Sequence, residues 1–170
     1  DAAVASLTVG EYAMGQGKPS FGEIEAVLLE KRAAVRAMFQ EWMLDEPVAE
    51  LLKSRQDFAN VRLAIRRAVT DRPIGTDYST EGNVPPELLV QAFEEDNYEL
   101  LPDYLRDAVE QAVLAYYQDK QIPAIDYAID QFEARHKVRR ATEIGEVFLL
   151  NLCRIEIDLT NIRTVFRVKY

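Results

Sequence analysis

The sequence predicts an all-α fold, built from an internally duplicated helical repeat of about six helices. Three observations support this prediction. The segment Asp57–Val69 recurs as Asp158–Tyr170, an offset of 101 residues from position 57 to position 158. Apolar residues recur at helical spacing through most of the chain, and prolines with other turn formers separate those stretches. A fixed offset of this kind is the signature of a repeat architecture.

Both copies of the repeated segment carry the same motif. Each reads Asp-x-x-Asn, then a β-branched aliphatic residue, an Arg, and a second Arg four residues later. The motif residues are Asp57, Asn60, Arg62 and Arg66 in the first copy and Asp158, Asn161, Arg163 and Arg167 in the second. Carried backwards without a gap, the same register makes residues 24–69 equivalent to residues 125–170.

Composition indicates a globular, acidic protein. Hydrophobic residues make up 48% and charged residues 29% of the 170 positions, which suits a chain with a sizeable core. The net charge of -9 would repel phosphate backbones, so nucleic acid is not expected as a partner. The single cysteine, Cys153, cannot form an internal disulfide and is interpreted as a buried small hydrophobe.

The N-terminal half is expected to hold two long helices. Residues 1–20 are interpreted as a partial helix and a turn. Ser20 and Glu23 form a capping box that predicts a helix over 21–44. Pro47 suits the first turn of a second helix, 47–70, which contains the first motif. The turn-forming segment 71–84 then predicts a loop.

Two shorter helices follow, and then the second copy. Prolines predict helix starts at 86–95 and 102–119, which complete a first repeat at 21–121. The segment 122–170 is expected to form an incomplete second repeat. Its basic run Arg135–Arg140 is expected to close a helix, because cations are favourable near a helix C-terminus.

The last segment alone is ambiguous. Its apolar and polar residues alternate over 155–160, which is typical of a strand. The equivalent first-copy segment, 54–69, has no such alternation and contains strong helix formers. If both copies share a fold, both are helices.

The sequence offers no catalytic residues and no cofactor or metal site. The segment at 15–20, GQGKPS, lacks the first glycine of a phosphate loop and has Pro19 where the motif needs Ser or Thr. His136 is the only histidine and is interpreted as a surface residue, so the pair that it forms with Glu133 is half of what a di-iron bundle needs.

The Asp-x-x-Asn motif is therefore interpreted as structural. A carboxylate and an amide in an apolar seam are costly unless hydrogen-bonded, so they should hold a neighbouring helix end or loop in register. We expect Asp57 and Asn60 to play this part in the first copy, and Asp158 and Asn161 in the second. The motif arginines could instead line a polar partner surface, at Arg62, Arg66, Arg163 and Arg167.

These residues together resemble the C-subunit family of archaeal and bacterial V/A-type ATPases, whose eukaryotic equivalent is the d subunit of V-ATPases. The resemblance rests on both motif copies and on a Pro-Pro-Glu-Leu-Leu helix start after a glycine-containing loop. The matching residues are Asp57, Asn60, Val61 and Arg62 with Pro85, Pro86, Glu87, Leu88 and Leu89, and Asp158, Asn161, Ile162 and Arg163.

The resemblance implies a funnel of three related helical repeats that joins the central shaft to the membrane proteolipid ring. Such a protein is a non-catalytic coupling subunit in proton or sodium ion transport. It is cytoplasmic and peripheral to the membrane through its complex. This chain holds about one and two thirds repeats, so we expect a fragment or a shortened member. The alternatives are a generic helical-repeat adaptor and a small enzyme with a polar pocket.

Overall fold

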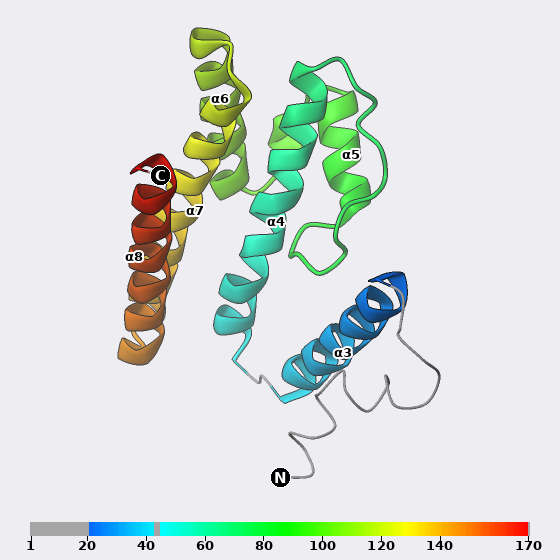
Figure 1. The fold of residues 1–170 in the computed structure, drawn as a ribbon. Coiled ribbons are helices and arrows are strands. Elements are labelled where there is room, and N and C mark those ends of the chain that lie inside the picture. Colours follow the sequence, from blue (N-terminus) through cyan, green and yellow to red (C-terminus); the bar gives the residue numbers. More distant parts are fainter. Residues whose placement is uncertain (1–20, 43–44, 170) are drawn as a thin grey trace. The chain divides into compact units, whose positions relative to one another are not determined.

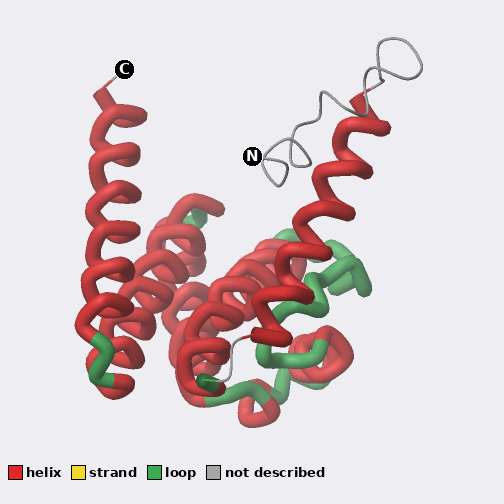
Figure 2. Tube along the Cα trace, turned by 90° about the horizontal axis from the view of Figure 1, so that it is seen from below, coloured by secondary structure: helices red, strands yellow, loops and turns green. Residues whose placement is uncertain are grey.

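The computed structural model describes residues 21–42 and 45–169, and in that part the chain is helical, with loops and no strand (Figures 1 and 2). The predicted all-α fold of about six helices is confirmed for these residues. The elements are α3 (Phe21–Trp42), α4 (Glu46–Val69), α5 (Pro86–Glu94), the 3-10 helix η1 (Tyr98–Leu100), α6 (Asp103–Asp119), α7 (Ile122–Ile144) and α8 (Val147–Lys169). The partial helix and turn expected over 1–20 lie outside the described residues.

The C-terminal segment, ambiguous from its own sequence, is one helix. α8 runs from Val147 to Lys169 without interruption. The alternation over 155–160 therefore does not reflect a strand, and the helix inferred from the first copy is confirmed.

Prolines and left-handed residues set the helix ends. Pro85 and Pro102 are the N-caps of α5 and α6, so each helix begins one residue after a proline whose missing N–H costs no intrahelical bond. Lys120 and Gly145 end α6 and α7 with positive φ angles of 55° and 83°. The prediction that the basic run Arg135–Arg140 closes its helix is wrong, because α7 continues to Ile144 and stops where Gly145 leaves the right-handed region.

The chain divides into two compact units, residues 1–46 and residues 47–170. In the second unit α6 packs along α7, and α7 packs along α8. The division at 46 differs from the repeat boundary at 121 that the sequence suggests, so the assignment of 21–121 and 122–170 as repeats stays a prediction.

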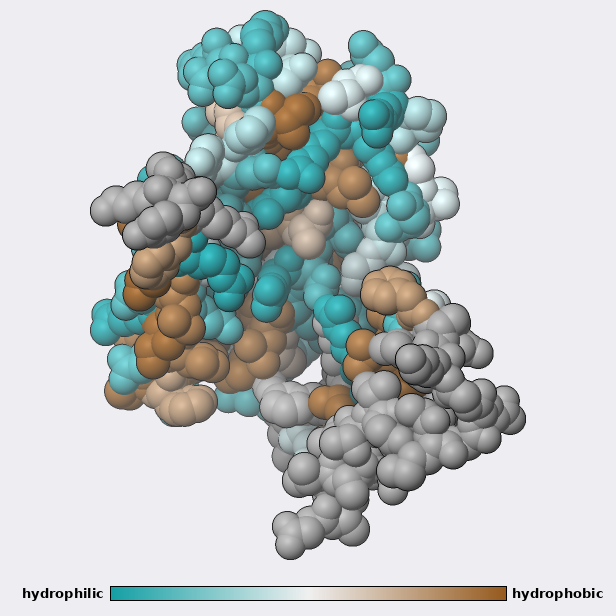
Figure 3. Space-filling view, viewed as in Figure 1, coloured by the Kyte–Doolittle hydropathy of each residue, from teal (hydrophilic) through white to brown (hydrophobic). Residues whose placement is uncertain are grey.

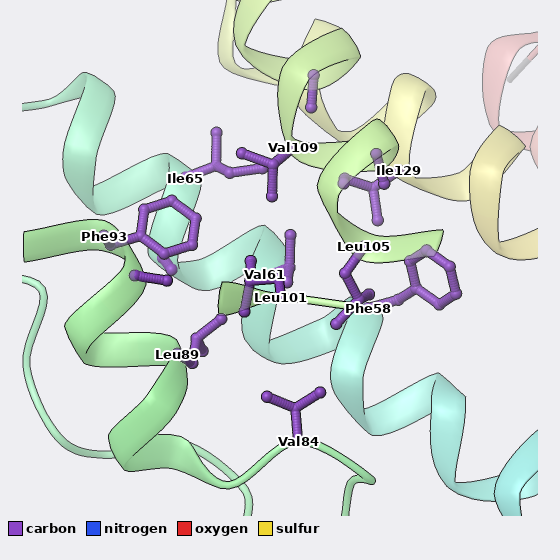
Figure 4. Close-up of a cluster of buried hydrophobic side chains, with 14 of the residues drawn as sticks. Phe58, Val61, Ile65, Val84, Leu89, Phe93, Leu101, Leu105, Val109 and Ile129 are labelled. Atoms are coloured by element: carbon purple, nitrogen blue, oxygen red, sulfur yellow. The ribbon is translucent and has the colours of Figure 1, made fainter. Parts of the chain in front are cut away.

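The main core joins α4, α5, α6 and α7 with the segments between them (Figure 4). α4 contributes Phe58, Val61 and Ile65, all with no exposed surface, and Leu105 and Val109 of α6 meet them. The buried members also include Val84, Leu89, Phe93, Leu101 and Ile129. Leu51, seven residues before Phe58, belongs to a smaller cluster with Ala141, Leu149 and Cys153 that joins α4, α7 and α8.

The helix starts follow the register of the duplicated sequence. α4 begins at residue 46 and α8 at residue 147, so the offset between these two helix starts is 101 residues. This agreement supports an ungapped duplication. That residues 24–69 superpose on 125–170 stays a prediction.

Shortening a core leucine should destabilise the protein far more than shortening an exposed one on the same helix. Leu105 is fully buried, whereas Leu114 is 49% exposed, and both lie on α6. We expect Leu105→Ala to lower the free energy of unfolding by about 2–5 kcal/mol, because a cavity is left. Leu114→Ala should stay within about 0.5 kcal/mol of wild type in urea denaturation. Equal losses would contradict this core.

Candidate functional site

The first Asp-x-x-Asn motif lies at a junction of α4, the following loop and α6. The carboxylate of Asp57 is buried and accepts three hydrogen bonds. The backbone N–H of Val84 donates to it at 3.0 Å, the side-chain amide of Asn83 at 2.9 Å and the hydroxyl of Tyr104 at 2.8 Å. All three donors come from outside α4, so one side chain holds the end of the loop and the start of α6. The predicted burial of Asp57 is confirmed.

The loop backbone approaches this carboxylate closely because residue 82 has no side chain. A Cβ atom at Gly82 would overlap the Oδ1 atom of Asp57. The amide of Asn83 also donates to the backbone carbonyl of Glu50 at 2.9 Å, which ties the same turn to the first part of α4. Residues 82–84 therefore fit as one unit against α4.

Asn60 holds the loop at a second point. Its side-chain amide donates to the carbonyl of Ser79 at 2.8 Å, and the N–H of Ser79 donates back to the Asn60 side-chain oxygen at 2.9 Å. Further along α4, Arg67 donates to the carbonyl of Ile74 at 2.6 Å and pairs with Asp77 at 2.7 Å. The loop is thus attached to α4 along its length.

Burial sets the electrostatics of the motif. It raises the pKa of Asp57 above its ordinary value, and the hydrogen bonds from Val84, Tyr104 and Asn83 oppose that shift. Burial, together with the nearby Asp57 carboxylate, also raises the pKa of Tyr104, which keeps its phenol protonated as the donor.

His136 of α7 completes this junction from the other side. Its ring stacks on Tyr104 with centroids 4.3 Å apart and meets the edge of Phe58 at 5.7 Å. The expectation that His136 is a surface residue is wrong, because only 9% of it is exposed. Burial, followed by the charges of Arg139 and Arg140, lowers its pKa to about 4, so the imidazole is neutral at pH 7.

The motif arginines of the first copy pair with acids of α7. Arg62 forms ion pairs with Asp130 and, at 3.9 Å, with Asp126, and Arg66 pairs with Asp126 at 2.5 Å. The four residues make a brace between α4 and α7, named the arginine brace below. The sequence analysis offered these two arginines as partner-facing, whereas the structure directs their charges to α7.

The second copy has a different environment. Asp158, Asn161 and Arg163 are exposed on α8, and the side chain of Arg167 lies outside what the structure describes. The prediction that Asp158 is buried like Asp57 is wrong in this structure. The physical reason is that the donors of Asp57 come from residues 83–104, and the described residues place no comparable segment against α8.

Sequence reasoning missed the partners of the motif. Asn83 and Gly82 lie in a stretch that is recognisable as a turn, but nothing marks that turn as the one that meets Asp57. Tyr104 and His136 carry no local signal. Their roles depend on tertiary contacts between α4, α6 and α7.

Clusters of metal-ligating side chains and the single thiol, Cys153, are the next candidates for a site. Residues 21–42 and 45–169 contain no group of three or more His, Cys, Asp or Glu side chains that could hold a metal ion. Cys153 is 5% exposed, and burial raises the pKa of its thiol, as expected for a small buried hydrophobe. None of the described helices is long and apolar enough to span a bilayer.

Comparison with family models identifies the chain. The model described as ATP synthase (C/AC39) subunit matches residues 5–170. The chain belongs to this family. The resemblance to the C-subunit family of V/A-type ATPases is thereby confirmed across nearly the whole sequence of this C/AC39 chain. Comparison with curated proteins and with solved structures gave no match.

Removing the Asp57 carboxylate should destabilise this C/AC39 chain, whereas the same change in the second copy should not. Asp57→Ala leaves the Val84 N–H and the Tyr104 hydroxyl without their buried acceptor, so we expect a loss of about 1–3 kcal/mol in the free energy of unfolding. Asp158→Ala is the matched control and should stay within about 0.5 kcal/mol. Equal effects in urea denaturation would reject the structural role.

Protonation of His136 should lower the free energy of unfolding as the pH falls below 6.5. Its pKa is about 4 in the folded chain against an ordinary value of 6.5, so the unfolded chain binds the proton more tightly. The stability contributed by the neutral ring is therefore complete above pH 6.5 and is lost as the pH falls toward 4. Glu143 opposes this shift, and Arg139 and Arg140 reinforce it.

The comparison variant is His136→Phe, which keeps an aromatic ring against Tyr104 and leaves Asp57 unchanged. Between pH 7 and 4.5 the wild type should lose up to about 3 kcal/mol more than His136→Phe, measured by urea denaturation at each pH. Parallel pH profiles for the two proteins would show that His136 is not held neutral by the fold.

Proposed function

We propose that this chain is a non-catalytic coupling subunit of a V/A-type rotary ATPase or ATP synthase. In this role it links the central shaft to the membrane proteolipid ring during proton or sodium ion transport. The observation that carries the proposal is the family match over residues 5–170. The chain would then lie peripheral to the membrane, on the cytoplasmic side, through its complex.

The contacts of the second unit support a mechanical role. A coupling element must pass torque between two partners without deforming, so its helices need cross-links that resist sliding. The arginine brace joins α4 to α7, which are 60 to 68 residues apart along the chain at the paired positions. Asp57 adds a second connection, from α4 to the loop and to α6. These links favour a stiff body.

The environment of the single histidine, His136, suits a structural role in a torque-transmitting subunit better than a catalytic role. A general acid or base needs a pKa near the working pH and access to a substrate. His136 instead has a pKa of about 4 and lies against Tyr104 and Phe58. Its ring serves as packing between α6, α7 and α4.

The proposal predicts that the chain binds both ends of the rotor. A tagged form of the protein should retain the isolated central-shaft subunits, and separately the detergent-solubilised proteolipid ring, of the same organism's rotary ATPase. A tagged helical protein of similar size and acidity is the control for charge-driven retention. Binding to neither partner would reject the coupling role and leave the generic helical-repeat adaptor.

Coupling itself can be measured in membranes. Vesicles that carry the complex without this subunit should still hydrolyse ATP but should not acidify or accumulate sodium. Adding the purified chain should restore ion transport without raising the hydrolysis rate of the detached catalytic head. A chain that changed hydrolysis by the isolated head would act on catalysis and not as a link.

A further inference from the structure

An open groove lies between α6 and α7 and has a volume of about 640 Å³. It is named the α6–α7 groove below and is lined by side chains from residues 107–119 and 124–135. Because α6 ends at Asp119 and α7 begins at Ile122, the two helices form a hairpin and run antiparallel, side by side (Figure 1). Hydrophilic residues gather over the end of this hairpin in Figure 3.

The two walls of the groove carry opposite charges. Asp107, Glu110 and Asp119 line the wall formed by α6, and Arg135 lines the wall formed by α7. In an antiparallel hairpin Asp107 and Arg135 lie at the same end of the groove, because they are similarly far along the chain from the turn that joins the helices. All four residues are exposed, and none forms an ion pair with a residue that the structure describes.

Arg135 is held on its own wall by an aromatic ring. Its guanidinium carbon lies 5.7 Å from the ring centroid of Phe132, within the range of a cation–π contact, and Phe132 packs against the main core. One turn before Asp107, by contrast, the carboxylate of Asp103 pairs with Arg106 at 2.9 Å. The charges on the two walls therefore face each other across the groove without neutralising each other.

Small side chains keep the space between the walls open. Ala115 of α6 and Ala124 and Ala128 of α7 line the groove. Tyr127, which is 59% exposed, adds an aromatic surface beside them. Since the distance between packed helices depends on the side chains at the contact, these alanines allow a third helix to approach closely.

The shape and the charge of the groove select its occupant. From Asp107 to Asp119 the groove follows α6 for about 18 Å, at about 1.5 Å per residue. Small-molecule sites bury most of the surface of their ligand, which an open groove of this length does not do. A helix packs its side-chain ridges into such a furrow along its whole length. Anionic lipid headgroups would be repelled by the three acids of α6.

We propose that the α6–α7 groove is a docking site for an amphipathic helix of another protein, with lysine or arginine on one flank and an acidic residue on the other. The cations of that helix pair with Asp107, Glu110 and Asp119. Its acidic residue pairs with Arg135, and its apolar residues between the two flanks pack on Tyr127. Such docking does not depend on the coupling role proposed above.

A designed helical peptide tests this groove in the native chain. The probe is a peptide of about 18 residues, about 27 Å long as a helix, with lysines along one flank, glutamates along the opposite flank and leucines between them. The control peptide has the same composition, with lysines and glutamates mixed on both flanks. In fluorescence anisotropy titrations the probe should bind roughly tenfold more tightly than the control. Equal binding of the two peptides would overturn the proposal.

Charge variants locate the binding on the protein. Asp107→Asn combined with Glu110→Gln should weaken binding of the probe roughly fivefold, because two ion pairs are lost. The matched control is Glu87→Gln combined with Glu94→Gln, which removes the same charge from exposed positions of α5 and should leave binding unchanged. Equal weakening by both double variants would mean that the probe is attracted by the acidic chain as a whole, which contradicts a site in the groove.

Filling the groove tests the site without altering its charge. Ala115→Trp should abolish binding of the probe, because the indole occupies the space between the walls, and should retain the wild-type helical circular dichroism. Arg135→Gln should weaken binding, whereas Arg139→Gln, at an exposed position of α7 outside the groove, should not. Unchanged binding by Ala115→Trp would place the probe elsewhere and overturn the proposal.

Discussion

The carboxylate of Asp57 is the contact on which the second unit depends. A buried charge is tolerated only when donors replace the water that it has lost, and here three donors do so. Since none of them belongs to α4, the cost of burying Asp57 enforces the position of the loop end and of Tyr104. Val84, held by Asp57, packs into the core just before α5 begins. Tyr104, also held by Asp57, lies in the first turn of α6, so this one side chain fixes the starts of both helices.

The two copies of the motif show that the same residues form buried contacts only where another segment packs against them. Asp57 and Asp158 share their neighbours in sequence, yet one is 1% exposed and the other lies on an open helix face. The difference comes from the segment packed against α4, which supplies both donors and apolar cover. The motif therefore occurs twice in the sequence, and in the described residues a loop and a helix pack against only the first copy.

Much of the fold could be predicted from the sequence because it rests on local signals. Prolines predicted the starts of α5 and α6 to within one residue. The 101-residue register correctly predicted a helix for the C-terminal segment, whose own sequence was ambiguous between helix and strand. Leu51, Phe58 and Ile65, which lie seven residues apart in the sequence, are all buried on α4. The candidate site was less accessible. Its residue types were recognisable, but their partners lie 19 to 68 residues away in the chain, and no local rule selects them.

His136 and the motif arginines illustrate that limit. A histidine among basic residues is expected to be exposed to solvent. His136 is buried because Tyr104 and Phe58 pack against its ring. From the sequence of α4 alone, arginines beside its apolar face are expected to extend into solvent. The acids at 126 and 130 become their partners only because α7 passes alongside.

The arginine brace makes the stiffness of the second unit depend on the salt concentration. Its ion pairs are partly exposed, with 28% to 52% of each side chain open to water, so dissolved ions reach them. Raising the salt concentration would weaken the attraction between α4 and α7 while leaving the apolar core untouched. The body would keep its fold, and α4 and α7 would slide past each other more easily under load.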